Sequence, residues 1–342
     1  MEKILFLAHT QADGTLPSVA RETLSAAVDL SRQLPGASLA VGLIGREVKP
    51  AVDAIAACGA ARFLAVTGAD FADSRYASDV AAVEALVRQV GATLVVAPTT
   101  SRFSRSLPGV VQRLQGRIET HVSGLEVAGE TLQVHRWYYR QRMVATLTRT
   151  QRPWFLVIDG GVFNPWQGNP GSAALDNIAV NLGESSTRTR VVGVQAPSAN
   201  TQTIRPDADI LFVAGAGWTK KQADGQIHLR EAEELILGFL QKGNASLGSS
   251  KSLVDQSTEG EPVLPFMSHL NQVGQTGSTP RHPKGLATCC HGEEPHAVGW
   301  RFINERRAIN TDANCGWAQG KADVLYVADA FQVMKKVNEL LT

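Results

Sequence analysis

The chain has 342 residues, of which 44% are hydrophobic, and its 33 basic and 32 acidic residues leave a formal net charge of +1. This length exceeds what a single hydrophobic core usually supports, so we expect two domains. A net charge so close to zero creates no general field for nucleic acid or for an anionic membrane surface, and neither is expected as a partner.

The N-terminal part alternates short β-branched runs with helical patterns. Strands are expected at residues 4–8, 38–44, 62–66 and 93–97, and helices at residues 17–33, 51–57, 80–90 and 106–114. Alternation of this kind predicts a parallel sheet with helices on both faces.

After residue 114 the alternation of strands and helices ends. Strand-like runs follow one another closely at residues 124–127, 131–139, 143–148 and 154–158, which predicts an antiparallel extension or edge. Residues from about 167 to 209 are polar and weakly periodic, and we place a hinge there. The expected domains are therefore an N-terminal α/β domain over residues 1–200 and a C-terminal one over residues 201–342.

The second half restarts the α/β pattern. Strands are expected at residues 209–214 and 323–328, and helices at residues 230–240 and 331–341. The predicted fold class is α/β with two domains, each with a mostly parallel sheet flanked by helices. The C-terminal domain is expected to be doubly wound in the Rossmann or flavodoxin manner.

Cysteine usage and the first residues bear on location. The four cysteines are Cys58, Cys289, Cys290 and Cys315, too few for a disulfide framework in so large a chain. The apolar run at residues 4–8 is too short for a signal-peptide core, and no stretch approaches the length of a membrane span. We expect a cytoplasmic protein without membrane insertion.

Two glycine-containing segments suggest ligand contact. Residues 271–277 (NQVGQTG) place two glycines three positions apart, so the backbone can approach a ligand while Gln and Thr side chains donate or accept. An ordinary polar surface turn is the alternative. Residues 215–217 (GAG) follow an apolar strand and indicate either a phosphate-approach turn, without the third glycine of the dinucleotide fingerprint, or a plain strand-to-loop turn.

Other catalytic patterns are weak. Adjacent Cys289 and Cys290, with His291, His296 and Cys315, lack the spacing of a zinc or iron–sulfur site, so buried packing of the cysteines is favoured over metal binding. No Ser–His–Asp order and no G-x-S-x-G turn is visible, so hydrolysis lacks support.

Several segments together resemble the flavin-binding region of electron-transfer flavoprotein alpha subunits. They are residues 247–255 (LGSSKSLVD), 272–277 (QVGQTG), His296 and residues 309–312 (INTD). Residues 18–30, 98–114, 139–147 and 160–163 are similar to the N-terminal half of the same family. The resemblance covers nearly the whole chain. It implies FAD as the cofactor and an electron carrier rather than a substrate-converting enzyme.

The resemblance also implies roles for residues. The isoalloxazine ring is expected against Ser250 and Lys251, with the Thr276 hydroxyl near flavin N5 and His296 at the O2 edge. The loop at residues 272–277 is expected along the ribityl and pyrophosphate groups, and residues 310, 312 and 329 near the adenosine. The implied cofactor-binding residues are Gly215, Ser250, Lys251, Gln272, Val273, Gly274, Gln275, Thr276, Gly277, His291, Gly292, His296, Asn310, Asp312 and Asp329.

The chain departs from the family pattern at several of these positions. Lys251 stands for the usual arginine over the ring, His291 for a serine, and Pro295 for a glutamine. The turn at residues 215–218 reads GAGW where the family has G-G-R-G. These departures motivate an alternative, a redox-inactive module of the same family that binds a nucleotide or a partner. A colourless protein that cannot take up the cofactor would favour that alternative.

Partners follow from the same resemblance. It implies a heterodimer with an electron-transfer flavoprotein beta subunit, a flavin-dependent dehydrogenase as electron donor, and a quinone-linked oxidoreductase as acceptor. Trp154, Phe163 and Trp166 are then candidates for interface residues, with a plain core role as the alternative.

Overall fold

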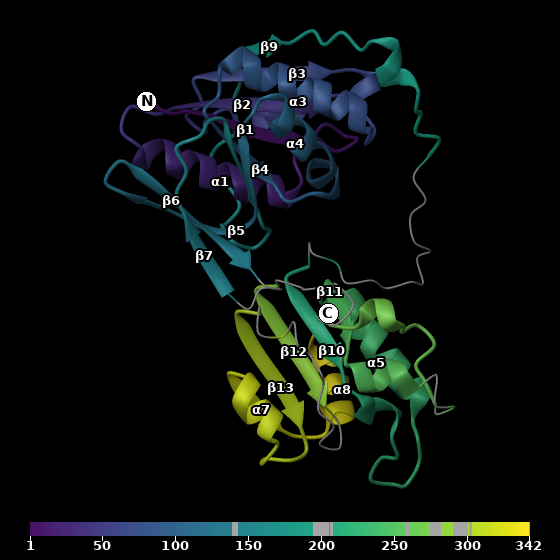
Figure 1. The fold of residues 1–342 in the computed structure, drawn as a ribbon. Coiled ribbons are helices and arrows are strands. Elements are labelled where there is room, and N and C mark those ends of the chain that lie inside the picture. Colours follow the sequence, from purple (N-terminus) through teal and green to yellow (C-terminus); the bar gives the residue numbers. More distant parts are fainter. Residues whose placement is uncertain are drawn as a thin grey trace. The chain divides into compact units, whose positions relative to one another are not determined.

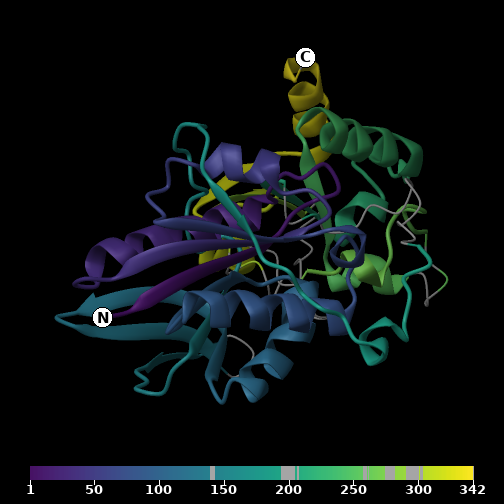
Figure 2. The ribbon, with the colours of Figure 1, turned by 90° about the horizontal axis from the view of Figure 1, so that it is seen from above.

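The structure is a computed structural model that describes residues 1–138, 143–193, 205, 208–256, 260, 262–273, 282–289, 300 and 303–341. The chain divides into two compact units, Met1–Val194 and Gln195–Thr342. Each unit has its own sheet (Figures 1 and 2). Each also has its own hydrophobic cores.

The first unit is built around a mixed sheet with strand order β7-β6-β5-β8-β4-β1-β2-β3-β9. Its strands are β1 (Lys3–His9), β2 (Ser38–Gly45), β3 (Arg62–Thr67), β4 (Leu94–Pro98), β5 (Arg117–Ala128), β6 (Thr131–Tyr138), β7 (Met143–Leu147), β8 (Trp154–Ile158) and β9 (Leu175–Asn177). Its α-helices are α1 (Ser18–Gln33), α2 (Lys49–Ile55), α3 (Tyr76–Val90) and α4 (Ser101–Arg113).

The central strands of this sheet are parallel and buried on both faces. β1 pairs in parallel with β2 and with β4, and β4 pairs in parallel with β8. Continuous apolar runs such as those of β4 and β8 suit this environment because helices cover both faces. The parallel sheet predicted from the alternating pattern is therefore confirmed.

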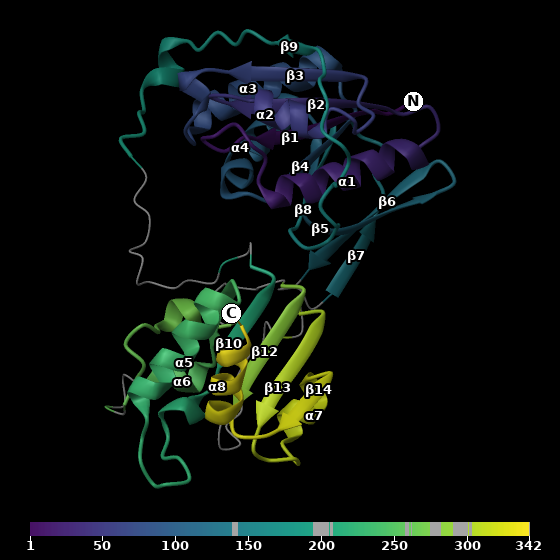
Figure 3. The same cartoon turned by 180° about the vertical axis from the view of Figure 1, so that it is seen from behind.

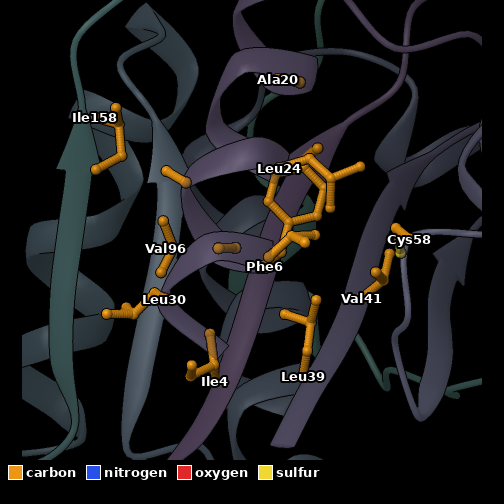
Figure 4. Close-up of a cluster of buried hydrophobic side chains, with 14 of the residues drawn as sticks. Ile4, Phe6, Ala20, Leu24, Leu30, Leu39, Val41, Cys58, Val96 and Ile158 are labelled. Atoms are coloured by element: carbon orange, nitrogen blue, oxygen red, sulfur yellow. The ribbon is translucent and has the colours of Figure 1, made fainter. Parts of the chain in front are cut away.

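Helices on the two faces complete two separate cores. On one face, Leu24 and Leu30 of α1 pack over Ile4 and Phe6 of β1 and Val96 of β4 (Figure 4). On the other face, side chains of α3 and α4 pack against Leu5 and Leu7 of β1 in a second cluster. The first unit is thus a three-layer arrangement, with α2 on the α1 face (Figure 3).

The antiparallel extension predicted after residue 114 is present as β5, β6 and β7, which pair in antiparallel fashion. β8 differs from that expectation, because it lies between β5 and β4 and is parallel to both. All five of its residues are buried, so its apolar run marks a central strand and not an edge. Trp154, the first residue of β8, is fully buried, which supports the core alternative for this tryptophan.

Part of the segment expected to be a hinge belongs to the first unit. β9 pairs in parallel with β3 at the sheet edge. Backbone N–H groups of Gly171 and Ile178 donate to the carbonyls of Asp53 and Ala65, both at 2.8 Å. This polar segment is held through backbone hydrogen bonds, which leave little trace in a hydrophobicity pattern.

The described strands of the second unit form a parallel sheet with order β11-β10-β12-β13-β14. They are β10 (Ile210–Ala214), β11 (Ala245–Ser249), β12 (Lys284–Cys289), β13 (Glu305–Asn310) and β14 (Val324–Val327). Counted along the chain this order is 2-1-3-4-5, that of the flavodoxin-like doubly wound fold, so the predicted fold class is confirmed here too.

Helices again cover both faces of this sheet. α5 (Leu229–Lys242) and α8 (Ala330–Leu340) pack together on one face, and α7 (Gly316–Lys321) lies on the other (Figure 3). The sequence pattern predicts β10, β14, α5 and α8, but it does not predict β11, β12 or β13. These three strands carry glycine, serine or charged residues that weaken the pattern of an apolar strand.

Candidate functional site

The carboxyl ends of the second sheet's strands form the edge at which a ligand is expected. In open parallel sheets, ligands bind outside these ends, near the point where the strand order reverses. The reversal occurs at β10, which has β11 on one side and β12 on the other. Six of the described residues predicted to bind a cofactor end these strands or follow them, namely Gly215, Ser250, Lys251, Asn310, Asp312 and Asp329.

The turn after β11 is anchored to the sheet. The Ser250 N–H donates to the Ala214 carbonyl at 2.9 Å, which ties the turn to β10. The Ser250 hydroxyl oxygen accepts from the Leu253 N–H at 3.2 Å and so caps α6 (Lys251–Asp255). A hydroxyl that accepts this bond retains its own hydrogen for donation to a ligand.

The first residues of the QVGQTG segment lie beside the same strand end. Gln272 forms an isolated parallel bridge with Ser249, and the Val273 N–H donates to the Ser249 carbonyl at 3.1 Å. Gly248 makes this approach possible, because a Cβ atom there would lie 2.6 Å from Cγ2 of Val273. The structure therefore brings Gln272 and Val273 next to Ser250.

An acidic residue that the sequence reasoning missed joins these two segments. The Asp255 carboxylate accepts from Lys251 Nζ through Oδ2 and from His269 Nε2 at 3.0 Å through Oδ1. Lys251 begins α6, whereas His269 begins the short 3-10 helix η5 (His269–Asn271) just before Gln272. The four-residue spacing from Lys251 to Asp255 is a signal that sequence reading could have used.

The turn after β10 is more buried than a ligand-facing loop. Gly215 precedes the 3-10 helix η3 (Ala216–Thr219), and residues 215–219 are all buried. The Gly215 N–H donates to the Thr288 carbonyl at 2.7 Å, and Trp218 Nε1 donates to Thr288 Oγ1 at 2.8 Å. The amide of Gly215 is thus already bonded within the protein, as in a plain strand-to-loop turn.

Asparagine and aspartate side chains shape the ends of β13 and β14. Oδ1 of Asn310 accepts from the Asp312 N–H at 2.9 Å, and Oδ1 of Asp312 accepts from the Asn314 N–H at 2.8 Å. Oδ1 of Asp329 accepts from the Gln332 N–H at 3.0 Å and caps α8. Each of these residues therefore has a structural task in addition to its predicted role at the adenosine.

The remaining predicted residues lie outside the described part of the chain. They are Gly274, Gln275, Thr276, Gly277, His291, Gly292 and His296. Of the cysteines considered as metal ligands, Cys315 is buried in a hydrophobic cluster. Within the described ranges, no group of three or more His, Cys, Asp or Glu side chains could hold a metal ion. The described helices include none long and apolar enough to cross a bilayer.

Two buried polar atoms at this edge test whether a cofactor fits. Ser249 Oγ at the end of β11 and Asn310 Nδ2 at the end of β13 are buried and have no hydrogen-bond partner among the described residues. Buried donors are almost always paired in folded proteins. A ligand rich in acceptor oxygens, such as a flavin dinucleotide, suits this donor set.

The first unit contains a buried cluster that sequence reading did not identify. The Asp79 carboxylate accepts from Arg102 Nε at 3.0 Å and from Nη2 at 2.6 Å. His9, at the end of β1, lies 3.6 Å from Asp79 and packs against the ring of Phe103. The cluster connects β1, α3 and α4, and we assign it a structural task.

Comparison with known protein families decides the relationship. The profile of the electron transfer flavoprotein domain matches residues 4–190, which is more than half of the chain. The chain belongs to the electron transfer flavoprotein family. The match covers nearly all of the first unit and does not distinguish alpha from beta subunits. A comparison with curated proteins finds no match. Membership of this family supports electron transfer as the general role and a partner subunit.

Proposed function

We propose that this chain is the alpha subunit of a heterodimeric electron-transfer flavoprotein, with FAD at the carboxyl edge of the second unit's sheet. The observation that carries the proposal is that separate segments resembling the flavin-binding region come to this one edge. The buried donors Ser249 Oγ and Asn310 Nδ2, without partners among the described residues, add to this support.

Different described residues would bind different parts of the cofactor. Ser250 and Lys251 would face the ring, where the lysine charge favours the more negative, reduced form of the cofactor. Gln272 would begin the loop along the ribityl and pyrophosphate groups. Asn310 and Asp329 would contact the adenosine, with Asp312 close by. When bound, the flavin would supply the electron-carrying chemistry, and these side chains would tune its potential.

The resemblance supplies further roles outside the described residues. The Thr276 hydroxyl would donate to the ring near N5, and His296 would face the O2 edge. Gly274, Gln275 and Gly277 would line the path of the phosphates. His291 and Gly292 would lie close to them.

The proposed partners follow from the same role. A flavin-dependent dehydrogenase would deliver electrons, and a quinone-linked oxidoreductase would accept them, with an electron-transfer flavoprotein beta subunit completing the carrier. Phe163 and Trp166, which are only partly buried, are candidates for the contact with that subunit. We propose a cytoplasmic location, in keeping with the free thiols of Cys58 and Cys315.

The decisive experiment is co-expression with an electron-transfer flavoprotein beta subunit. We expect a yellow heterodimer with flavin absorption bands, from which FAD is released on denaturation. A partner dehydrogenase should bleach these bands, and an acceptor should restore them. A colourless heterodimer that takes up no FAD on reconstitution would contradict the proposal.

Asp329 offers a test of the adenosine contact that separates binding from folding. Asp329→Ala is expected to weaken FAD binding by about 1–3 kcal/mol, because a charged hydrogen-bond acceptor is lost. It also removes the cap of α8, at a cost of about 1 kcal/mol in the free energy of unfolding. Asp329→Asn keeps the cap, since asparagine caps helices as well as aspartate does, and is expected to weaken FAD binding by about 1 kcal/mol.

Fluorescence titration of the flavin-free heterodimer with FAD measures the affinity, and thermal unfolding measures the stability. If both variants bind FAD as the wild type does, Asp329 serves only as a helix cap.

A further inference from the structure

The carboxylate of Asp255 is shared between two side chains from different segments. Its Oδ2 accepts from Lys251 Nζ, and its Oδ1 accepts from His269 Nε2 at 3.0 Å. Because a carboxylate only accepts, the His269 nitrogen facing it must carry the proton. The side chain of Asp255 is 26% exposed, against 45% for Lys251 and 50% for His269, so the acid is the least exposed of the three.

Stability of α6 does not explain the ion pair. The helix has only five residues, with Lys251 first and Asp255 last. A cation at the start and an anion at the end oppose the helix dipole, and this order of an i,i+4 pair is the weaker one. The pair therefore gives the helix little stability, and its bond to His269 is the unusual feature.

His269 connects the acid to the second segment of the site. It begins η5, which is capped by Ser268 and leads directly into Gln272 and Val273 beside β11. Asp255 thus joins the segment that carries Lys251 to the segment that opens the QVGQTG loop.

We propose that Asp255 is a positioning residue that holds the Lys251 ammonium beside the flavin and moderates its charge, with His269 orienting the carboxylate. This inference rests on the proposed function, since it is the flavin that would sense the charge. A positive charge beside the ring favours the reduced flavin, and the Asp255 carboxylate offsets part of that charge. Loss of the Asp255 charge should therefore raise the reduction potential.

The test uses the heterodimer with FAD. Asp255→Asn is expected to raise the ratio of reduced-FAD to oxidised-FAD affinity by about tenfold, as one charge acting over several ångströms would. Lys251→Met is expected to lower the same ratio by about tenfold. Asp255→Glu should leave the ratio close to that of the wild type, because glutamate keeps a carboxylate that can reach both Lys251 and His269. Spectroscopic redox titration gives the ratio for each variant.

A second measurement does not depend on the cofactor. Hydrogen–deuterium exchange of residues 268–273 in the flavin-free heterodimer should be several-fold faster in Asp255→Asn, because the bond to His269 is weakened. The matched control is Asp53→Asn. Asp53 pairs with Lys49 at the same four-residue spacing in α2 of the first unit, and its loss should change neither the potential nor this exchange.

The outcomes separate this inference from the proposed function. A yellow heterodimer in which Asp255→Asn leaves both the potential and the exchange unchanged overturns the positioning role and leaves the flavoprotein proposal intact. If Asp255→Asn fails to fold, Asp255→Glu and Lys251→Met decide, and a potential unmoved in Lys251→Met overturns the inference. A heterodimer that binds no FAD overturns both proposals.

Discussion

Replacing Asp79 by asparagine is expected to destabilise the first unit by about 3–5 kcal/mol, the usual cost of breaking a buried ion pair. The side chain of Asp79 is fully buried, and that of Arg102 is 12% exposed. Arg102 also donates to the carbonyls of Phe71 at 2.8 Å and Ala72 at 3.1 Å, so it cannot turn towards water without losing these bonds. The variant would leave a buried guanidinium without its counter-charge.

Urea denaturation of the full chain, with hydrogen exchange in α3 and α4 to assign the loss to the first unit, measures this effect. The control is Asp176→Asn, which removes the exposed partner of Arg62 at 2.9 Å. Exposed pairs contribute at most about 1 kcal/mol. If Asp79→Asn and Asp176→Asn lower the free energy of unfolding equally, the ion pair between Asp79 and Arg102 does not make the large contribution expected of it.

The same cluster predicts that acid weakens the first unit. Burial by itself raises the pKa of Asp79, but the hydrogen bonds and the charge of Arg102 hold it below its usual value. The stability that Asp79 contributes is therefore present above the ordinary aspartate pKa and is lost as pH falls through the lowered one. Burial lowers the pKa of His9, so the unfolded chain binds a proton that the folded chain does not.

Both groups therefore make the free energy of unfolding decrease as the pH is lowered. For His9 this decrease begins below about pH 6.5. We expect His9→Phe to flatten the stability curve below about pH 6.5, because it removes a group that binds a proton more readily in the unfolded chain than in the folded one, while the Asp79 contribution at lower pH remains. Urea unfolding at a series of pH values tests this. An unchanged slope in His9→Phe would assign the acid sensitivity to other groups.

Trp218→Ala is the second substitution expected to have a large effect, with a loss of about 3–5 kcal/mol in the second unit. The ring of Trp218 is fully buried and lies 4.6 Å from the ring of Phe331 on α8, measured between centroids. Its Nε1 also donates to Thr288 on β12. Removing the ring would open a cavity between the sheet and α8, directly beneath the edge where we place FAD.

Trp218→Phe separates packing from hydrogen bonding. It keeps an aromatic ring but loses the bond to Thr288, so a cost of about 1 kcal/mol is expected in addition to that of the smaller ring. Thermal unfolding and hydrogen exchange in β10 and β12 measure both variants. The control Leu340→Ala removes a side chain that is 70% exposed, and should change stability by about 0.5 kcal/mol or less. A comparable loss in Leu340→Ala and Trp218→Ala would contradict the core role of Trp218.

The sequence predicted which strands and helices form the layers of this fold better than it predicted where each helix begins. Continuous apolar runs such as β4 identified the central parallel strands, because burial on both faces leaves a strong pattern. Helix starts were less accurate. α4 begins at Ser101 with Thr100 as its cap, ahead of the expected residue 106, and α2 begins at Lys49 with Pro50 in its first turn, ahead of residue 51. The sequence carries a start signal for each helix, a threonine cap for α4 and a proline in the first turn for α2, and both signals lie ahead of the first residues with apolar helical spacing.

At the candidate site, the sequence could indicate which residues end up at one edge but not how they are used. Ser250 and Lys251 were expected beside a ligand, and the structure places them after β11. The bond between Asp255 and His269 spans fourteen residues and depends on the path of the chain between them, which no local pattern encodes. The burial of Trp218 was also hidden, since a glycine-rich turn gives no sign of what covers it.

Each compact unit is made from one uninterrupted stretch of chain, with the border near residue 194. During synthesis, the first unit can therefore complete its sheet on the ribosome before most of the second unit has been translated, since domains form as units from the N-terminus. The central strand β8 emerges after β5, β6 and β7, so the sheet is complete only when β8 enters between β4 and β5. A truncated transcript ending at this border would still yield a complete first core, and such a fragment is a direct starting point for studying the two units apart.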